Sequence, residues 1–227
     1  MIVYGKQIVL YVLDKFPEMI EEVYLQKEID KKLFHRFSKL DKRIVRVDSK
    51  KAQAMARGGN HQGFLLLVKD VVFTPFDELK VGKFLVVLYG ITDVGNIGAI
   101  VRSAYVFGAD GVIITGLKHI ALEPVVRSSA GALLSMPLAL YPKTLDLINE
   151  LKMSGFKTYG AGFGGENLKD VKFGEKKALF LGSEGEGIPQ KILSRLDKIV
   201  SIKMAREFDS LNVSAAAAVL CDRIANG

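Results

Sequence analysis

Residues 181–225 decide the fold of this chain and read LGSEGEGIPQKILSRLDKIVSIKMAREFDSLNVSAAAAVLCDRIA. They contain a glycine-rich acidic turn at 182–187, a strand-like run from Ile199 to Met204 and a polar turn at 210–212. The small apolar residues that follow predict a helix. A tight glycine turn beside carboxylates, followed by a hydroxyl and an amide two residues apart, indicates a functional site.

The segments before this stretch alternate between apolar runs and helical patterns. Residues 84–88 read FLVVL, a continuous apolar run typical of a strand buried on both faces of a parallel sheet. We expect further strands at 111–115, 138–141, 157–163 and 178–181, and helices at 96–107, 124–136 and 144–154. Gly108 is the expected end of the first helix. The order predicts an α/β domain with a mostly parallel sheet and helices on both faces.

The first 70 residues predict a smaller and more basic domain. Helices are expected at 4–16, 28–40 and 49–57, the last with Ser49 as a cap, and strands at 23–25, 44–47 and 64–68. The chain carries a net charge of +7, and residues 31–57 alone hold ten basic and two acidic side chains. Such a patch is typical of a nucleic-acid-binding surface. We expect domains at 1–70 and 83–227, joined by a linker at 71–82.

Composition excludes several classes of protein. The chain has 227 residues and one cysteine, Cys221, which rules out a disulfide framework and a cysteine-based zinc cluster. His35, His61 and His119 lack ligand spacing, so no metal is expected. No signal peptide and no run of about 20 apolar residues is visible, so we expect a cytoplasmic protein without a membrane span.

Polar side chains gather in the loops that should leave the carboxyl ends of the strands, where parallel sheets bind ligands. These loops span 90–96, 182–187 and 205–212 and hold Asn96, Glu184, Ser210 and Asn212, with Arg102 one to two turns into the following helix. The turn GSEGEG lacks the Lys and Ser/Thr of a phosphate loop, and its carboxylates would repel a pyrophosphate. A neutral or cationic ligand fits better. The GxGxxG spacing of a nucleotide-binding dehydrogenase is also missing.

Three segments carry a family resemblance: NIGAIVRSAYVFGADGVII at 96–114, LFLGSEGEGIP at 179–189 and SIKMAREFDSLNVSAAAAVL at 201–220. In this order they resemble the three motifs of the SpoU (TrmH-type) RNA ribose 2′-O-methyltransferases. The basic domain, which ends in NHQG at 60–63, is similar to the L30e-like RNA-binding domain of the branch that methylates guanosine in 23S rRNA. Asn60, His61 and Gln62 either contact RNA or simply form a turn into the next strand.

The resemblance implies a fold and a set of ligands. The second domain should be an α/β (trefoil) knot of the SPOUT type, whose C-terminal segment threads through a loop and forms the pocket for S-adenosylmethionine. The family works as a homodimer with its active site at the interface, and its substrate partner is RNA. The residues that match the family's cofactor contacts are Gly182, Ile202 and Leu211.

The resemblance also implies the catalytic set. Arg102 is the catalytic residue, either as the base or, as we prefer on chemical grounds, as the group that holds the substrate phosphate, because a guanidinium keeps its proton. Asn96 either positions the site or caps its helix, and Glu184 either holds the constellation or pairs with Arg102. Ser210 and Asn212 organise the loop or cap the last helix. Glu186 is expected to be solvated and Cys221 to be buried core, and Arg127 meets either RNA or a partner subunit.

Two other functions compete with methylation of a guanosine in 23S rRNA. A related enzyme would methylate ribose in tRNA. A protein of another class would bind RNA or assist ribosome assembly without catalysis, although the presence of all five catalytic-type residues argues against it. The sequence does not identify the target nucleotide.

Overall fold

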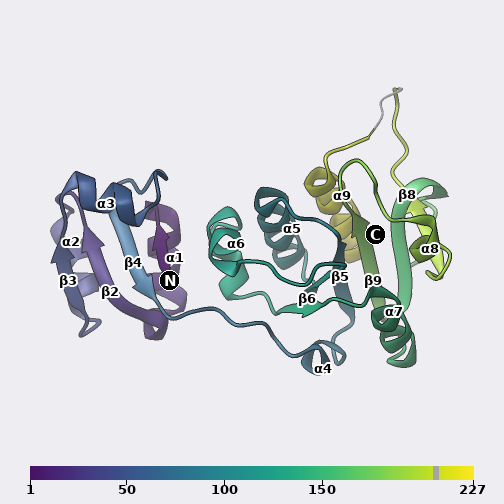
Figure 1. Cartoon of the computed structure of the whole chain (residues 1–227), viewed down its shortest axis with the longest axis horizontal. Helices are drawn as coiled ribbons and strands as arrows, with labels where there is room; N and C mark the ends of the chain where they lie inside the picture. Colours follow the sequence, from purple (N-terminus) through teal and green to yellow (C-terminus); the bar gives the residue numbers. More distant parts are fainter. Residues whose placement is uncertain (207–209) are drawn as a thin grey trace. The chain divides into compact units, whose positions relative to one another are not determined.

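The computed structural model describes residues 1–206 and 210–227 (Figure 1). The expected polar loop at 205–212 therefore lies partly outside the described residues. The chain forms two compact units. The first contains Met1–Val72 and Leu122–Gly131, and the second contains Phe73–Ala121 and Ala132–Gly227.

The first unit contains a four-stranded sheet in the order β1-β4-β2-β3. Its strands are β1 (Ile2–Tyr4), β2 (Ile20–Leu25), β3 (Arg43–Arg46) and β4 (Phe64–Val68). Its helical segments are α1 (Lys6–Lys15), η1 (Pro17–Met19), α2 (Lys31–Ser38), α3 (Ser49–Met55) and α6 (Leu122–Ser128). Strands β2 and β3 are parallel, and the other pairs are antiparallel. The sequence predicted the α/β arrangement of residues 1–70 except for β1, which is too short to show a periodic pattern, and it placed the residues of α6 in the second domain.

Local side-chain chemistry explains where the helices of the first unit begin. Asp30 caps α2 by accepting a hydrogen bond from the Leu33 amide at 2.8 Å. Asp48 caps α3 in the same way through the Lys51 amide at 2.7 Å. The expected cap at Ser49 is therefore wrong by one residue, because the longer carboxylate of Asp48 reaches the first turn.

The second unit contains a six-stranded sheet in the order β10-β8-β9-β5-β6-β7, and all its pairs are parallel. Its strands are β5 (Phe84–Tyr89), β6 (Gly111–Thr115), β7 (Leu138–Tyr141), β8 (Lys157–Asn167), β9 (Lys177–Gly182) and β10 (Lys198–Ser201). Its helical segments are α4 (Phe76–Leu79), α5 (Val94–Val106), η2 (Ala132–Leu134), α7 (Thr144–Met153), α8 (Gln190–Leu193) and α9 (Val213–Asn226). The predicted parallel α/β sheet is confirmed.

Helices cover both faces of this sheet. Leu85 and Val87 of β5 belong to a core that also contains Leu147 of α7 and Ile192 of α8. The alternate side chains of β5 point to the opposite face and are also fully buried. On that side α5 and α9 pack against each other and against the sheet (Figure 1). The sheet is therefore buried on both faces, which explains the continuous apolar run that predicted β5.

Some predicted boundaries differ from the structure. The helix expected at 124–136 begins earlier and ends at Ser128, because Ala130 and Gly131 adopt left-handed backbone conformations with φ of 53° and 89°. The strand expected at 157–163 continues to Asn167, and the run that began at Ile199 ends as a strand at Ser201. Part of the stretch expected to be a linker forms α4, whose Leu79 is buried in the core of the second unit.

A helix that crosses a bilayer must be long and almost entirely apolar. In the part of the chain that the structure describes, no helix combines the required length with the required apolarity.

Candidate active site at the carboxyl edge of the parallel sheet

The register of two central strands brings two of the polar loops together. Strands β5 and β9 are neighbours, and their last residues, Tyr89 and Gly182, lie opposite each other. The loop after β5 leads into α5, and the loop after β9 holds Glu184. Both loops therefore leave the same edge of the sheet, where α/β proteins bind their ligands.

Three of the predicted site residues form a hydrogen-bonded cluster at this edge. Asn96 Nδ2 donates to Glu184 Oε1 at 3.1 Å, and Asn212 Nδ2 donates to Asn96 Oδ1 at 3.1 Å. Asn212 Nδ2 also donates to the same carboxylate oxygen of Glu184. Each residue comes from a different one of the three sequence motifs, and Asn96 lies 88 positions from Glu184 and 116 from Asn212 in the chain. We call these three residues the polar cluster.

Asn212 caps the last helix, one of the roles considered for it. Its Oδ1 accepts hydrogen bonds from the amides of Ser214 at 2.9 Å and Ala215 at 3.4 Å, which makes it the N-cap of α9. Since Oδ1 faces the helix, Nδ2 is left to donate to Glu184 and Asn96. The helix start therefore fixes the orientation of the amide in the polar cluster.

Asn96, in contrast, does not cap its helix. Helix α5 begins at Val94 and is capped by Asp93, whose Oδ1 accepts from the backbone amide of Asn96 at 2.7 Å. The expected helix start at Asn96 is therefore wrong, and its side chain is available to Glu184. Sequence reasoning missed Asp93, although an aspartate three residues before Asn96 is a recognised capping signal.

The glycine turn after β9 is closed by its own backbone. Ser183 and Gly187 form an isolated bridge, with the Gly187 amide donating to the Ser183 carbonyl at 2.9 Å. A Cβ atom on Gly182 would lie 2.2 Å from the carbonyl carbon of Gly187 and 2.5 Å from the amide nitrogen of Ile188. Gly182 is therefore required for the turn that presents Glu184, whatever ligand it also contacts.

We expect Gly182→Ala to open this turn and to separate Glu184 from Asn96, because the added methyl group collides with backbone that cannot move aside. Methyl transfer and binding of S-adenosylmethionine should both fall by at least about tenfold, with a loss of about 1–3 kcal/mol in unfolding free energy, the usual cost of overpacking. Isothermal titration and thermal unfolding measure these effects. Gly185→Ala is the matched control: nothing lies within 4 Å of its added Cβ, although its φ of 99° adds local strain. Equal effects of the two changes on cofactor binding would contradict the steric argument.

Arg102 projects from a different side of α5 than Asn96 does. It follows Asn96 by six residues on α5, which places it about 9 Å further along the helix axis and about 120° around it. Its side chain is exposed, and no carboxylate among the residues described lies within 4 Å of it. Of the two roles considered for Glu184, the structure therefore shows the hydrogen-bonded constellation and not an ion pair with Arg102.

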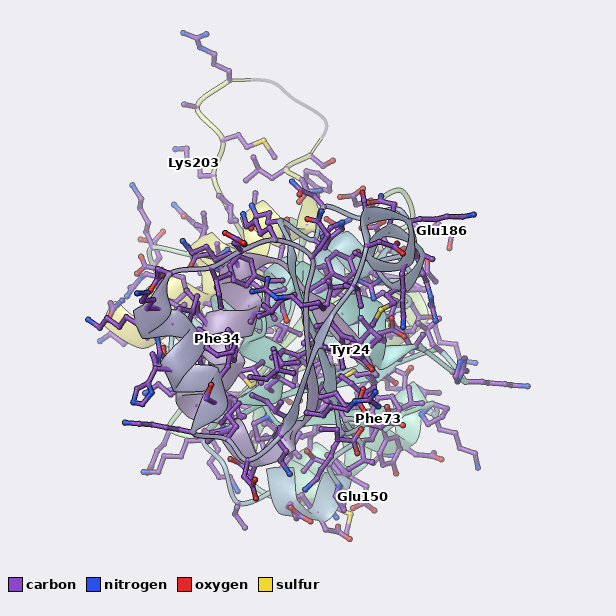
Figure 2. The ribbon with its side chains drawn as sticks, turned by 90° about the vertical axis from the view of Figure 1, so that its left-hand side faces the viewer. Tyr24, Phe34, Phe73, Glu150, Glu186 and Lys203 are labelled. Atoms are coloured by element: carbon purple, nitrogen blue, oxygen red, sulfur yellow. The ribbon has the colours of Figure 1, made fainter. Side chains whose placement is uncertain are left out.

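The remaining predicted residues lie at the end of β9, after β10 or before α9. Gly182 is two positions before Glu184, and Leu211, with 42% of its surface exposed, precedes Asn212. Ile202 is partly exposed directly after β10, and Ser210 is exposed. Glu186 is exposed as expected (Figure 2).

Cys221 is not part of this site. It is buried inside α9, and burial raises the pKa of its thiol to about 12. The thiolate that a nucleophile requires is therefore strongly disfavoured. The expectation of a buried core cysteine is confirmed.

The other candidate positions make intramolecular contacts within the first unit. His61 Nδ1 accepts from the Gly63 amide at 3.0 Å, and Gln62 Oε1 accepts from the Lys6 amide at 3.0 Å. These bonds close the turn before β4 and serve the start of α1, which favours the structural role for both residues. Arg127 pairs with Glu123 at 2.7 Å on α6.

No cluster for a metal ion was found within residues 1–206 and 210–227: no group of three or more His, Cys, Asp or Glu side chains is placed to hold one.

Two protein-family models match the chain. The SpoU rRNA Methylase family matches residues 83–222, and RNA 2'-O ribose methyltransferase substrate binding matches residues 2–72. An uncharacterized tRNA/rRNA methyltransferase of Mycolicibacterium paratuberculosis is 32% identical over 213 residues, which cover 89% of this chain and 69% of that protein. One from Archaeoglobus fulgidus is 33% identical over 151 residues, 66% of this chain and 67% of that protein. The chain spans 61% of the length of a relative from Mycolicibacterium gilvum.

Solved structures share the fold. The SpoU methyltransferase AviRb of Streptomyces viridochromogenes, in complex with AdoMet, superposes with a TM-score of 0.80 at 23% identity and covers 99% of this chain and 89% of its own. An AdoMet-bound rRNA methyltransferase of Sinorhizobium meliloti gives a TM-score of 0.78 at 21% identity, with 98% and 85% covered. The resemblance carried by the three motifs is confirmed. The chain therefore belongs to the SpoU rRNA Methylase family of S-adenosylmethionine-dependent RNA ribose methyltransferases.

Proposed function

We propose that this protein transfers the methyl group of S-adenosylmethionine to a ribose 2′-hydroxyl of RNA, and that its substrate is a guanosine of 23S rRNA. The observation that carries the proposal is the polar cluster. Asn96, Glu184 and Asn212 come from three separate motifs and meet at one edge of the parallel sheet. If the three motifs form one site, their polar residues must meet in this way.

The residues at this edge fit S-adenosylmethionine. Glu184 and Glu186 give the glycine turn a negative charge that suits a sulfonium cation, and the turn itself contains no cationic side chain. Gly182, Ile202 and Leu211 would hold the cofactor through backbone groups and partly exposed apolar side chains. When bound, the cofactor supplies an activated methyl group with a good leaving group. The knot expected from the resemblance is part of this proposal, because it would bring the chain after β10 back to α9 across the cofactor.

Arg102 would bind the second substrate, the RNA. The ribose hydroxyl is almost wholly protonated at neutral pH, so the site must align it and assist the loss of its proton. A guanidinium with a pKa above about 12 is a poor base but a good bidentate ligand for phosphate. We infer that Arg102 holds the neighbouring RNA phosphate and orients the hydroxyl, and that this phosphate assists removal of the proton.

A homodimer would bring Arg102 to the polar cluster. Within one chain the two are separated along and around α5, so a second copy is the simplest source of the missing cation. Apolar side chains are exposed on the two helices that pack together: Tyr105 and Val106 of α5 are 43% and 67% exposed, and Val219 of α9 is 45% exposed. Such exposure is typical of an interface between subunits.

Labelled methyl transfer tests the proposal. The purified full-length chain is incubated with S-adenosylmethionine labelled in its methyl group and with 23S rRNA, 16S rRNA or bulk tRNA, and the products are digested to nucleosides. We expect label in 2′-O-methylguanosine from 23S rRNA. Label confined to tRNA would support the alternative substrate, and cofactor binding without transfer to any RNA would favour a non-catalytic RNA-binding protein.

We expect the basic surface of the first unit to contribute to RNA affinity by charge alone. Lys50 and Lys51 on α3 are exposed, and neither forms an ion pair with a described residue. Lys50→Ala/Lys51→Ala should weaken RNA binding and reduce the slope of log affinity against log salt by up to about 2, because each phosphate contact contributes roughly one unit.

Filter binding at several salt concentrations measures this slope. Lys83→Ala/Lys157→Ala is the control with the same change of charge, since both residues lie at the amino ends of strands in the second unit. An unchanged slope in the α3 variant, or an equal change in the control, would show that α3 is not part of the RNA surface.

A further inference from the structure

Strand β8 carries a bulge at its carboxyl end. Its pairing with β10 runs through Gly160, opposite Ile199, and resumes at Glu166, opposite Val200. Because Ile199 and Val200 are consecutive, the intervening residues of β8, 161–165 with the sequence AGFGG, have no partners in the ladder. Bulges of this kind re-aim a side chain and are common next to active sites.

The backbone around this bulge is held in place. Ser201 Oγ donates to the carbonyl of Gly165 at 2.9 Å. A Cβ on Gly165 would lie 2.7 Å from the carbonyl carbon of Ile199, so only glycine permits this close approach. Gly164 has a φ of 71°, a left-handed conformation that favours glycine. The sequence therefore specifies the shape of the bulge.

Phe163 is at the centre of the bulge and has 73% of its surface exposed. Burial of a phenylalanine side chain normally stabilises the fold, and this position does not use that stabilisation. A backbone held in this way can present the ring of Phe163 as a stacking face for a ligand.

The register places Phe163 at the same edge as the polar cluster. Gly160 of β8 lies opposite Phe180 of β9. Phe163 follows Gly160 by three positions, and Glu184 follows Phe180 by four. Because the two strands are neighbours about 4.8 Å apart, both side chains are carried beyond the same end of the sheet.

The charge around the bulge favours an anionic partner. Lys203, on the segment that leaves β10, is exposed, and it forms no ion pair with a described residue. The nearby carboxylate of Glu166 is neutralised by Lys198 at 2.7 Å. Figure 2 shows Lys203 and Glu186 at one end of the second unit and Glu150 of α7 at the other.

We propose that Phe163 is a base-stacking residue that binds an unpaired nucleobase of the RNA next to the methylated ribose, with Lys203 contacting its phosphate. This inference rests on the proposed function. Aromatic rings and cations together are the combination by which proteins bind single-stranded RNA, whose splayed bases stack on the ring. A Phe163 ring used in this way selects a single-stranded target and positions its ribose beside the polar cluster.

Two measurements on Phe163→Ala test the proposal. In methyl transfer, the KM for RNA should rise roughly tenfold, the effect of losing one stacked base, while kcat and the Kd for S-adenosylmethionine stay within about twofold. In fluorescence anisotropy with a labelled 12-nucleotide RNA, affinity for the single strand should fall by a similar factor, and affinity for the same RNA as a duplex should not change. Phe163→Trp should restore both. Met153→Ala is the control, because Met153 is 85% exposed at the end of α7 that leads into the amino end of β8.

The outcomes separate this inference from the proposed function. An unchanged KM and unchanged single-strand affinity in Phe163→Ala, with an active wild type, would overturn the stacking role and leave the methyltransferase intact. A raised Kd for S-adenosylmethionine in the variant would overturn it too, since the ring would then contact the cofactor. If the wild type methylates no RNA but its single-strand affinity depends on Phe163, the proposed function fails and the stacking role stands.

Discussion

Replacement of Arg102 by alanine should lower kcat for methyl transfer by at least about 100-fold and leave the Kd for S-adenosylmethionine within about twofold of the wild type. The expected loss is of the size seen when one charged or hydrogen-bonding group that acts in the transition state is removed. Cofactor binding should survive because Arg102 is exposed and, among the described residues, forms no ion pair with Glu184 of the glycine turn. Single-turnover kinetics and isothermal titration measure the two quantities.

Arg102→Lys is the informative companion. Lysine keeps the positive charge but loses the planar fork that binds a phosphate in two places, so its activity should lie between those of wild type and alanine. If Arg102→Ala instead weakens cofactor binding while turnover at saturating cofactor persists, the phosphate-holding role is wrong.

A mixture of variants tells whether Arg102 acts across a dimer. Subunits that carry Arg102→Ala are co-refolded with subunits that carry Asn212→Ala, and the mixed dimers are isolated by differential tags. If Arg102 serves the partner's site, one of the two sites contains both changes and the other contains neither, so activity reappears. If it serves its own chain, every site contains one change and the mixture stays inactive.

Asn212→Asp should reduce methyl transfer at least tenfold with little loss of stability. The aspartate keeps an oxygen that caps α9, but its second oxygen replaces the amide that donates to Glu184 and Asn96. Two carboxylates then face each other, and the polar cluster opens. Asn212→Ala should lose the cap as well, at about 1 kcal/mol, a fall in Tm of roughly 2–4 °C for a chain of this size.

Two further variants isolate the cause. Asn226→Asp is the matched control, because Asn226 lies at the other end of α9 and its amide likewise donates to a carboxylate, Asp222, at 2.8 Å. It should leave transfer unchanged. Adding Glu184→Gln to Asn212→Asp removes the repulsion, so stability should return to the wild-type value. Full activity in Asn212→Asp alone would contradict a role for the polar cluster in transfer.

The sequence by itself was sufficient for much of the fold and for the family. The continuous apolar run of β5 predicted a strand buried on both faces, and Gly108 marked the end of α5, where its φ is 73°. These features are local, because periodicity and backbone preference act within a few residues. The three motifs predicted the family in the same way, since each is a short stretch of characteristic sequence.

Helix starts were less certain, because several neighbouring polar residues can compete for one cap. Asp48 was chosen over Ser49 and Asp93 over Asn96 by which side chain reaches the amides of the first turn. The helix expected at 124–136 was interrupted at Ala130, which adopts a left-handed conformation. Alanine rarely does so, and the sequence therefore gave no sign of the interruption.

Only the tertiary structure decided how the site is assembled. It paired the amide of Asn212 with Glu184 and Asn96, and it packed Gly182 closely against the backbone of its own turn. It also showed the bulge that presents Phe163, which depends on the pairing of β8 with β10. These are contacts between segments far apart in the chain. The sequence determined which side chains could do the chemistry, and strand register and helix packing determined which of them meet, because those distances are set by long-range pairing that no local pattern encodes.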